Sequence, residues 1–214
     1  MFSCLIQNQI CSLKIILDNI GKKYNYHWIF RNLNQELTGP SHWGILGNNG
    51  SGKSTLLKLL TGFLSPSEGS IKWDEELTNT TIFRYIGIAS PHLELIEEFS
   101  LIEILTFHNK FRSFIDGNTV QSLVGLSGLG KNADKPLRYY SSGMKQRVKL
   151  ILAIMSNNPL IILDEPCSNL DEQSIAWYQK LVKDFTADRL LIIGSNDKNT
   201  ECFSCQHFIN LSVL

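Results

Sequence analysis

The sequence lacks the long apolar runs and the charge bias that mark several common classes of protein. Apolar stretches such as LIIL (160–163) and LLII (190–193) are far shorter than the ~20 residues that a membrane-spanning helix requires. The 214 residues include 20 basic and 20 acidic side chains, so the formal net charge is zero, and no block of like charge stands out. This balance argues against attachment to nucleic acid or acidic lipid by electrostatics alone, and we expect no direct contact with nucleic acid.

The chain also lacks a cysteine framework and a secretory signal. Its cysteines are an odd number without framework spacing, which indicates free thiols in a cytosolic protein; they are Cys4, Cys11, Cys167, Cys202 and Cys205. Cys202 and Cys205 with His207 resemble half of a metal site, but no second CxxC completes four ligands. The N-terminus has no basic start, and three polar residues at 7–9 interrupt it, so it is a poor signal peptide. We expect a cytosolic protein that touches a membrane only through a partner.

What the sequence does contain is a phosphate-binding loop. The segment GNNGSGKST fits the pattern G-x-x-x-x-G-K-[ST], and it lies between a strand-like segment, WGIL, and a helix-like one, LLKLL. In such a loop, backbone N–H groups and the N-terminus of the following helix converge on one anion. Lys53 can reach the β- and γ-phosphates, and the Ser54 hydroxyl can ligate Mg²⁺. The motif predicts that a nucleoside triphosphate is bound by Gly47, Asn48, Asn49, Gly50, Ser51, Gly52, Lys53, Ser54 and Thr55.

Alternating strand and helix patterns predict an α/β fold around this loop. Strands are expected at 13–20, within 27–37, and at 43–46, 70–73, 82–89, 160–163 and 190–194. Helical patterns cover 94–135, one face of 144–155, and 171–185. We therefore expect a P-loop NTPase, with a mostly parallel sheet core, an antiparallel N-terminal β part and an inserted α-helical subdomain. The chain has no internal repeats or low-complexity linkers, which favours one continuous unit.

A pair of carboxylates follows the apolar segment LIIL. Asp164 stands where a buried strand ends, which is the edge of an open α/β sheet where ligands bind. Asp164 can hold the Mg²⁺ shell, and the adjacent Glu165 can orient or deprotonate an attacking water. Two acidic residues that merely cap the next element are the alternative, which the preceding phosphate loop makes less favourable.

A second anion-binding helix start is indicated in YYSSGMKQRVKL (139–150). Ser142 and Gly143 open an amphipathic helix, whose N-terminus can bind an anion. A plain N-capped helix would account for the serine, but it leaves the pattern Ser-x-Gly-x-x-Gln-Arg unexplained.

With these motifs the chain resembles the ATPase subunits of ABC (ATP-binding cassette) transporters over nearly its full length. GNNGSGKST corresponds to the Walker A motif of that family, and SSGMKQR stands at its signature position. LIILDEP corresponds to Walker B with its glutamate, and SNLD (168–171) corresponds to the D-loop. The four motifs agree with the family in order and spacing, so the match is specific.

The resemblance implies an architecture and a set of partners. It implies a single ABC ATPase domain over residues 1–214, with a helical subdomain inserted at about 92–157. ATP on Walker A of one subunit would be covered by the signature of a second subunit, which we expect to be another copy of the chain. A transmembrane permease subunit is the other implied partner, and it would hold the protein at the inner face of the cell membrane.

The resemblance also assigns roles to individual residues. The signature residues would act on the ATP of the partner, with Ser141 and Gly143 touching its γ-phosphate; they are Ser141, Ser142, Gly143 and Met144. Asp171 of the D-loop would line the seam between subunits. Tyr24 lies where the family often places an aromatic ring that stacks on adenine, and an ordinary core or surface tyrosine is the alternative.

Three departures from the family pattern concern hydrolysis. The signature usually reads LSGGQ, whereas residues 140–144 read YSSGM, which keeps the serine and the second glycine. The glutamine expected after the strand at 82–89 is missing, and Ser90, Pro91 and His92 occupy that region. The expected switch histidine is Asn196, whose amide can hydrogen-bond a γ-phosphate but cannot hold a proton. These departures leave ATP binding intact and predict slow hydrolysis, with Glu165 and Asn196 as the catalytic residues.

Three functions are compatible with this pattern. The first is an ATP-hydrolysing subunit that drives a membrane transporter. The second is a soluble ABC-type ATPase of DNA repair, chromosome structure or translation, but such proteins usually carry two cassettes, a long coiled coil or basic arms. The third is a regulatory nucleotide-binding module with little turnover, which Asn196 suggests and the retained Glu165 opposes. Salt-dependent nucleic-acid binding would favour the second, and ATP binding without phosphate release the third.

A surface for the membrane partner is expected between Ser90 and Phe99. This stretch concentrates apolar side chains at the entrance to the helical part, and they are Leu93, Leu95, Ile96 and Phe99. The alternative is that these residues fill the core of the helical part.

Overall fold

The computed structural model describes residues 13–74 and 77–213, so Cys4, Cys11 and the N-terminal stretch that makes a poor signal peptide lie outside the described residues. The chain begins with an antiparallel sheet in the strand order β2-β1-β4. Its strands are β1 (Lys14–Tyr24), β2 (His27–Thr38) and β4 (Glu68–Trp73). The predicted antiparallel N-terminal β part is confirmed.

A five-stranded parallel sheet forms the core, in the order β5-β6-β7-β3-β8. Every pairing of neighbouring strands in this sheet is parallel. The strands are β3 (Ser41–Leu46), β5 (Ile86–Ala89), β6 (Leu160–Asp164), β7 (Leu190–Ser195) and β8 (His207–Asn210). Because all five run the same way, their carboxyl ends share one edge of the sheet, where β3, β6 and β7 deliver the motif residues.

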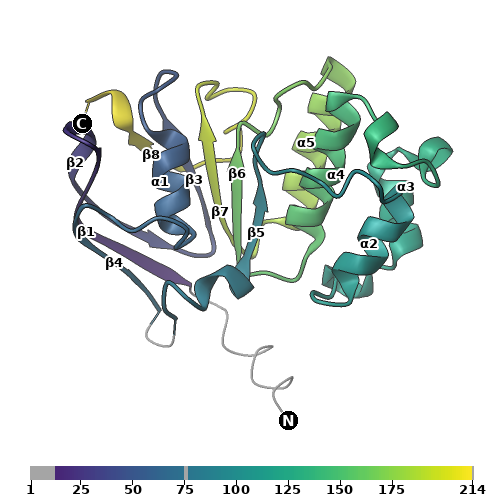
Figure 1. Cartoon of the computed structure of the whole chain (residues 1–214), viewed down its shortest axis with the longest axis horizontal. Helices are drawn as coiled ribbons and strands as arrows, with labels where there is room; N and C mark the ends of the chain where they lie inside the picture. The colour runs from purple at the N-terminus through teal and green to yellow at the C-terminus, as the bar shows by residue number, and fades with distance from the viewer. Residues whose placement is uncertain (1–12, 75–76, 214) are drawn as a thin grey trace, which may run out of the picture.

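Helices cover both faces of the core sheet (Figure 1). The phosphate-loop helix α1 (Lys53–Leu60) packs on β6 and β7 on the side that faces the antiparallel sheet. The other side carries α2 (Leu101–Asn109), α3 (Val120–Ser127), α4 (Ser142–Met155) and α5 (Glu172–Phe185). Within the described residues, no helix combines the length and the apolar character needed to cross a membrane.

The alternation of side chains along β6 explains why two hydrophobic cores form. Leu160 and Ile162 point to the core that contains α1 and the antiparallel sheet. Ile161 and Leu163 point to the core that contains α4 and α5. Successive side chains of a strand face opposite sides, so a strand that is covered on both sides is apolar throughout. The apolar run LIIL therefore reports a central strand between two layers.

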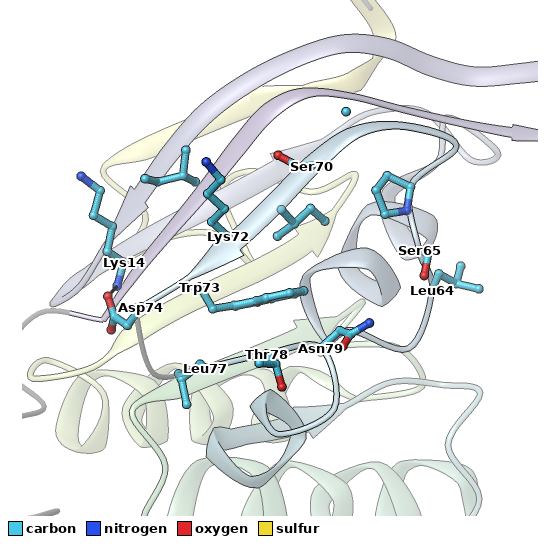
Figure 2. A pocket seen from close by; sticks show the side chains of 14 residues that line it. Lys14, Leu64, Ser65, Ser70, Lys72, Trp73, Asp74, Leu77, Thr78 and Asn79 are labelled. Carbon is cyan, nitrogen blue, oxygen red and sulfur yellow. Dashed lines mark hydrogen bonds between the residues drawn. The ribbon is translucent and has the colours of Figure 1, made fainter.

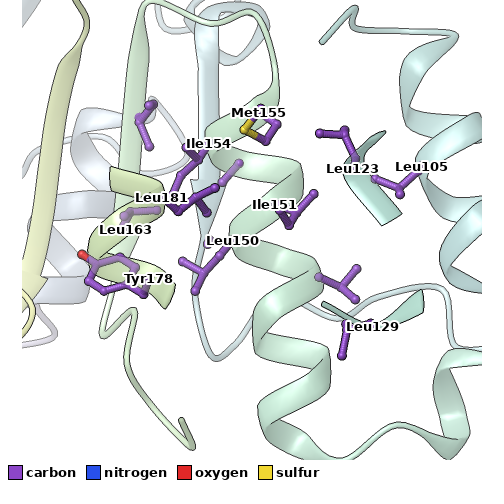
Figure 3. Packing of buried hydrophobic residues seen from close by; sticks show 14 of the residues in the cluster. Leu105, Leu123, Leu129, Leu150, Ile151, Ile154, Met155, Leu163, Tyr178 and Leu181 are labelled. Atoms are coloured by element: carbon purple, nitrogen blue, oxygen red, sulfur yellow. The ribbon is translucent and has the colours of Figure 1, made fainter. Parts of the chain in front are cut away.

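The long helix α4 is buried on more sides than its sequence pattern predicted. The expected single apolar face ran through Met144, Val148, Ile151, Leu152 and Met155, but Leu150 and Ile154 are also fully buried. Figure 3 shows the reason: some α4 side chains point toward Tyr178 and Leu181 of α5, and others toward Leu105 of α2 and Leu123 of α3. The helix lies between the core sheet and α5 on one side and α2 and α3 on the other.

The structure corrects two of the sequence predictions and adds one strand. The first half of the strand expected at 82–89 is a 3-10 helix over Ile82–Tyr85. Hydrogen bonds from the amides of Thr81 and Ile82 to the Thr78 carbonyl wind the chain there. The helical pattern expected over 94–135 is only partly formed, as α2 and α3, and no α-helix covers 110–119 or 128–135. Residues 94–99 are not helical either, because a capping box between Ser100 and Glu103 starts α2 only at Leu101. The short strand β8 was not predicted.

Candidate functional site

The phosphate loop joins the end of β3 to the start of α1, as the motif requires. Gly52 caps α1 with a φ of 100°, which is left-handed backbone that favours glycine. A Cβ atom there would also lie 2.3 Å from Cγ2 of Ile29 on β2. The glycine at this position is therefore required both by backbone conformation and by the close approach of β2.

Lys53 points its amine back over the loop. The side chain is only 5% exposed, and Nζ donates to the carbonyl oxygens of Gly47 at 2.9 Å and Asn48 at 3.2 Å. No carboxylate lies within ion-pair distance of it among the described residues, so its positive charge is not neutralised by the protein. A buried cation that binds only carbonyl oxygens is suited to a phosphate group.

Asp164 lies at the carboxyl end of β6 and is 5% exposed. Its Oδ2 accepts a long hydrogen bond of 3.4 Å from Ser90 Oγ, whereas Oδ1 is buried and has no hydrogen-bond partner within the described residues. Ser54 and Asp164 line the same cavity, which has a volume of about 840 Å³. An unpartnered carboxylate oxygen beside a serine hydroxyl fits Mg²⁺, which prefers oxygen ligands.

The donor set indicates how a metal would be completed. Among residues 13–74 and 77–213 there is no group of three or more His, Cys, Asp or Glu that could hold a metal ion alone. Mg²⁺ in nucleotide sites usually takes one or two protein ligands together with phosphate oxygens and water. Ser54 and Asp164 therefore fit Mg²⁺ that arrives with a nucleotide.

Glu165 has an unusual backbone conformation. Its φ is 45°, which is left-handed for a residue with a side chain, and its amide donates to the Gly194 carbonyl on β7 at 2.9 Å. Such a conformation costs about 1–3 kcal/mol and persists only when surrounding contacts hold it. The left-handed residue thus ends β6 directly after Asp164, and its amide stays bonded to β7.

Asn196 follows β7 and reaches the phosphate loop. Its Nδ2 donates to Oδ1 of Asn49 over 3.4 Å, which is a long and weak bond. Residues 147 positions apart in the chain are thus neighbours. The structure brings Asn196 together with the phosphate loop, as the resemblance implied for the switch position.

Two residues at the loop after β5 had no role assigned from the sequence: Ser90 of the loop itself and Lys149 of α4, which binds the loop. Ser90 is 8% exposed and donates to Asp164, and Lys149 of α4 donates to the carbonyl oxygens of Ser90 and Pro91, each at 3.1 Å. His92 is exposed, and only its backbone amide contacts Ser90 Oγ, at 3.4 Å. A signal for Ser90 was available in the sequence, because it is a polar residue at the carboxyl end of a strand, which is the edge of the sheet where ligands bind.

Tyr24 ends β1 at the hairpin with β2. Its ring is 47% exposed, and Lys22 Nζ lies 5.5 Å from the ring centroid. The same β2 strand supplies Ile29, which sits against Gly52 of the phosphate loop. An exposed ring on a hairpin that borders the loop is free to stack on a planar ligand.

The signature residues begin α4 and are open to solvent. Ser141 caps the helix, with its Oγ accepting a bond of 3.2 Å from the Met144 amide, and Ser142 is exposed beside it. A Cβ on Gly143 would lie 2.7 Å from the Asn169 carbonyl oxygen, so the D-loop packs directly on the signature. Asp171 of the D-loop caps α5 by accepting from the Ser174 amide at 2.8 Å, and hydrogen bonds from Ser174 lower the pKa of Asp171.

The signature and the phosphate loop of one chain are not brought together. Helix α1 packs in the core with the antiparallel sheet, whereas α4 packs in the core with α2, α3 and α5. The parallel sheet lies between these two layers (Figure 1). Two helix N-termini that suit anions therefore stand on opposite faces of the sheet.

A second cavity of about 880 Å³ lies along β4, the edge strand of the antiparallel sheet. Figure 2 shows Lys14 and Lys72 on one side of it and Thr78 and Asn79 on another, with Trp73 between. The Trp73 indole donates to the Leu60 carbonyl at 3.0 Å and so ties the strand to the end of α1. None of the phosphate-loop residues lines this cavity.

Comparison with known proteins gives a consistent family. The family model described as "ABC transporter" matches residues 30–168. The chain is 28% identical over 198 residues to the lantibiotic transport ATP-binding protein SrtF of Streptococcus pyogenes, across 90% of this chain and 84% of the relative. It is 30% identical over 169 residues to the cytochrome c biogenesis ATP-binding export protein CcmA of Rhodopseudomonas palustris, across 78% and 83%.

Solved structures have the same fold. An ATP-binding cassette captured as a dimer in a post-hydrolysis state with ADP and Pi superposes with a TM-score of 0.78. The two chains are 22% identical, and the match covers 92% of this chain and 95% of the cassette. The predicted fold class is confirmed by this match together with the strand topology.

Proposed function

The chain belongs to the ABC transporter family of ATP-binding proteins, and from this premise we propose that it binds ATP with Mg²⁺ and hydrolyses it to drive a membrane transporter. The observation that carries the proposal is that Ser54 and the unpartnered Oδ1 of Asp164 line one cavity, while the adjacent Lys53 has no counter-ion among the described residues. Bound Mg²⁺ would neutralise charge on the phosphates. In this proposal the whole chain acts as one ABC ATPase domain, with its helical part at about 92–157.

In the proposed site each phosphate-loop residue has a role. The loop amides cradle the phosphates, Lys53 contacts the β- and γ-phosphates, and Ser54 and Asp164 hold the metal shell. Tyr24 stacks on adenine from the neighbouring hairpin. Each role is supported by the position of the residue around one loop.

For hydrolysis, Glu165 orients and deprotonates the attacking water. Asn196 donates its amide to the γ-phosphate, and its contact with Asn49 supports this placement. An amide has no proton to share near neutral pH, which supports a slow reaction. A regulatory module with little turnover is the competing function, and it is favoured by the same asparagine and by Ser90 and His92 in place of a glutamine.

We further propose that the working form is a dimer of two copies. The signature residues Ser141, Ser142, Gly143 and Met144 then cover the ATP of the partner, and Asp171 lines the seam. The exposure of Ser141 and Ser142 supports this arrangement, because both side chains are open to solvent at the helix N-terminus.

A docking surface for the membrane subunit is supported by the cavity of about 840 Å³. Beyond Ser54 and Asp164 the cavity runs along the edge strand β5 to residues 90–95. Its apolar lining includes Phe63, Phe83, Ile88, Leu93 and Leu95. Several are well exposed, among them Phe63 at 77% and Phe83 at 54%. An exposed apolar groove of this kind marks a protein interface. Docking there would hold the protein at the inner face of the cell membrane.

The exposures within this stretch refine the sequence-based proposal. Leu93 and Ile96 are exposed, at 39% and 42%, and they are available to a partner. Leu95 and Phe99 are half-buried and pack against the helical core. The stretch thus combines both alternatives, with two residues for the core and two for the surface.

Nucleotide binding tests the proposal first. Lys53→Ala should abolish high-affinity Mg-ATP binding, as measured by titration calorimetry, because it removes the charge that faces the phosphates. Lys58→Ala on the same helix is the matched control, since Lys58 is exposed and outside the loop. Unchanged ATP affinity in Lys53→Ala would refute the phosphate site.

A further inference from the structure

A buried glutamate behind the site has no role in the arrangement described so far. Glu201 lies in the loop between β7 and β8 and is only 6% exposed. Among the described residues no cation lies within ion-pair distance of it. A carboxylate is expensive to bury without a compensating partner, so its position calls for a physical reason.

The two carboxylate oxygens of Glu201 serve two different segments of the site. Oε1 accepts a short hydrogen bond of 2.7 Å from the backbone amide of Cys167. Oε2 accepts a hydrogen bond from the hydroxyl of Ser195. Cys167 is two residues after Glu165, and Ser195 is directly before Asn196. One side chain therefore ties together the segments that carry both proposed catalytic groups.

The rest of the loop holds Glu201 in place. The buried hydroxyl of Tyr178 on α5 donates to the Glu201 carbonyl at 2.9 Å, and the Glu201 amide donates to the Asp197 carbonyl at 3.2 Å. Ser195 Oγ also accepts from the Asp197 amide at 2.8 Å. The backbone of Glu201 is thus anchored to α5 and to Asp197, and its carboxylate is anchored to the end of β7 through Ser195.

The turn that Glu201 secures is the strained one. Within it, Glu165 and Asn169 both have left-handed backbone, with φ of 45° and 62°. Such residues need contacts that fix them from outside. The bond from Cys167 to Glu201 fixes the turn between these two residues, and burial raises the pKa of Glu201, while its bonds from Ser195 and Cys167 favour the ionised form.

We propose that Glu201 is a positioning residue for ATP hydrolysis, which holds Glu165 and Asn196 in register by joining the Cys167 turn to the end of β7. This inference rests on the proposed hydrolytic function of Glu165 and Asn196. Glu201 itself does not contact the phosphate loop in any hydrogen bond of the described residues. It acts through the two segments, because a small displacement of either one spoils the alignment of water, phosphate and amide.

Three substitutions separate positioning from simple structural support. Glu201→Ala removes both bonds and should lower kcat by about 10- to 100-fold, with KM for ATP changed by less than about threefold. Glu201→Gln keeps an oxygen for the Cys167 amide and gains an N–H₂ that can donate to Ser195, so it should retain most of kcat. Gln179→Ala is the matched control, because it removes a bond of 3.1 Å from α5 to Thr200 in the same loop and leaves both carboxylate bonds in place.

Amide hydrogen exchange gives a second readout that does not require turnover. In nucleotide-free protein, exchange of the segment 165–169 should be faster in Glu201→Ala than in wild type, and unchanged in Glu201→Gln. If the wild type hydrolyses no ATP, the proposed function fails, and the exchange comparison still decides whether Glu201 holds the turn.

Wild-type kcat in Glu201→Ala would overturn the proposal, and so would an equal loss in Gln179→Ala. A Gln variant as slow as the Ala variant would also overturn it, since charge rather than position would then set the rate. If Glu201→Ala does not fold, Ser195→Ala removes the carboxylate bond at the β7 end, together with the bond from the Asp197 amide, and keeps the bond from Cys167. It should lower kcat severalfold, and an unchanged kcat there would contradict the inference.

Discussion

The phosphate loop and the signature turn are two helix N-termini of the same chain, and their surroundings differ. At α1 the loop closes over the helix, and Lys53 is buried beneath two carbonyl oxygens. At α4 the helix starts with Ser141 and Ser142 in solvent, and its inward side rests on the D-loop through Gly143. At the first the charged group is buried and held by its own chain, whereas the second presents its groups outward.

The difference follows from the layers of the fold. The two helices belong to hydrophobic cores on opposite faces of the parallel sheet. A chain that folds this way cannot place its own signature over its own phosphate loop without crossing the sheet. A second copy of the chain can place its signature there, which supports the proposed dimer.

The largest expected effect is a loss of ATP hydrolysis with ATP binding kept. Glu165→Gln should lower the hydrolysis rate by ~10²–10⁴, because a general base contributes about that much. ATP affinity should stay close to wild type and an ATP-bound dimer should accumulate, as seen by phosphate release and size-exclusion chromatography. Glu98→Gln, at an exposed glutamate in the stretch before α2, is the control. A Glu165→Gln protein with wild-type turnover would remove Glu165 from its role.

The next prediction tests the division between the two regions directly. Lys53→Ala disables the phosphate loop, and Gly143→Asp disables the signature, since a side chain there meets the Asn169 carbonyl. Each variant alone should be inactive, and Gly143→Asp should still bind ATP. When the two variants are mixed in equal amounts, about half of the dimers should be hybrids. Each hybrid has one intact site out of two, so about a quarter of the wild-type activity should return. Wild-type specific activity should also rise with protein concentration.

A mixture that stays inactive at every ratio would contradict the two-chain site. Thr119→Ala controls for the loss of a helix start elsewhere, because Thr119 caps α3 as Ser141 caps α4. Its loss should reduce stability by about 1 kcal/mol and leave the hydrolysis rate unchanged.

A smaller effect on kcat is expected from substitution of Asn196, which contacts the phosphate loop. Asn196→Ala should lower kcat by about 2- to 10-fold, the equivalent of one hydrogen bond. Wild-type turnover should vary little between roughly pH 6 and 8, since the amide does not titrate. Asn196→His should raise the rate and introduce a dependence on pH in this range. Measurement of kcat across that range decides, and a wild-type rate in Asn196→Ala would place this residue outside the catalytic shell.

The smallest effect on the isolated ATPase is expected in the stretch 90–99, at the end of the groove beside β5. Ile96→Asp should leave folding stability within about 0.5 kcal/mol and leave ATP binding intact, because the side chain is exposed. It should reduce recovery of the protein with membranes that contain its partner. Leu95→Asp should instead lower the melting temperature, since Leu95 packs against the helical core. Equal recovery of Ile96→Asp and wild type would rule out this part of the surface.

Sequence reasoning worked where the signal is local. The phosphate loop has its own glycine pattern, and the strand LIIL is apolar throughout because layers cover both of its faces. It failed at 82–85, where the residues favour a strand but form a 3-10 helix, because the Thr78 carbonyl accepts from the amides of Thr81 and Ile82. It also missed Glu201 and Lys149, whose partners lie 34 and 59 positions away in the chain. No local pattern reports such contacts.

The sequence by itself determined the chemistry of this protein: a loop that can bind phosphate, an acidic pair at a strand end and a second helix start with a serine cap. Each is set by residues that are neighbours in the chain, where turn geometry, capping and side-chain type act directly. Tertiary structure alone decided which of these groups share a site. Strand order brings Asp164, Ser54 and Asn196 to one edge of the sheet, while the burial of α1 and α4 in separate cores keeps the signature away from it.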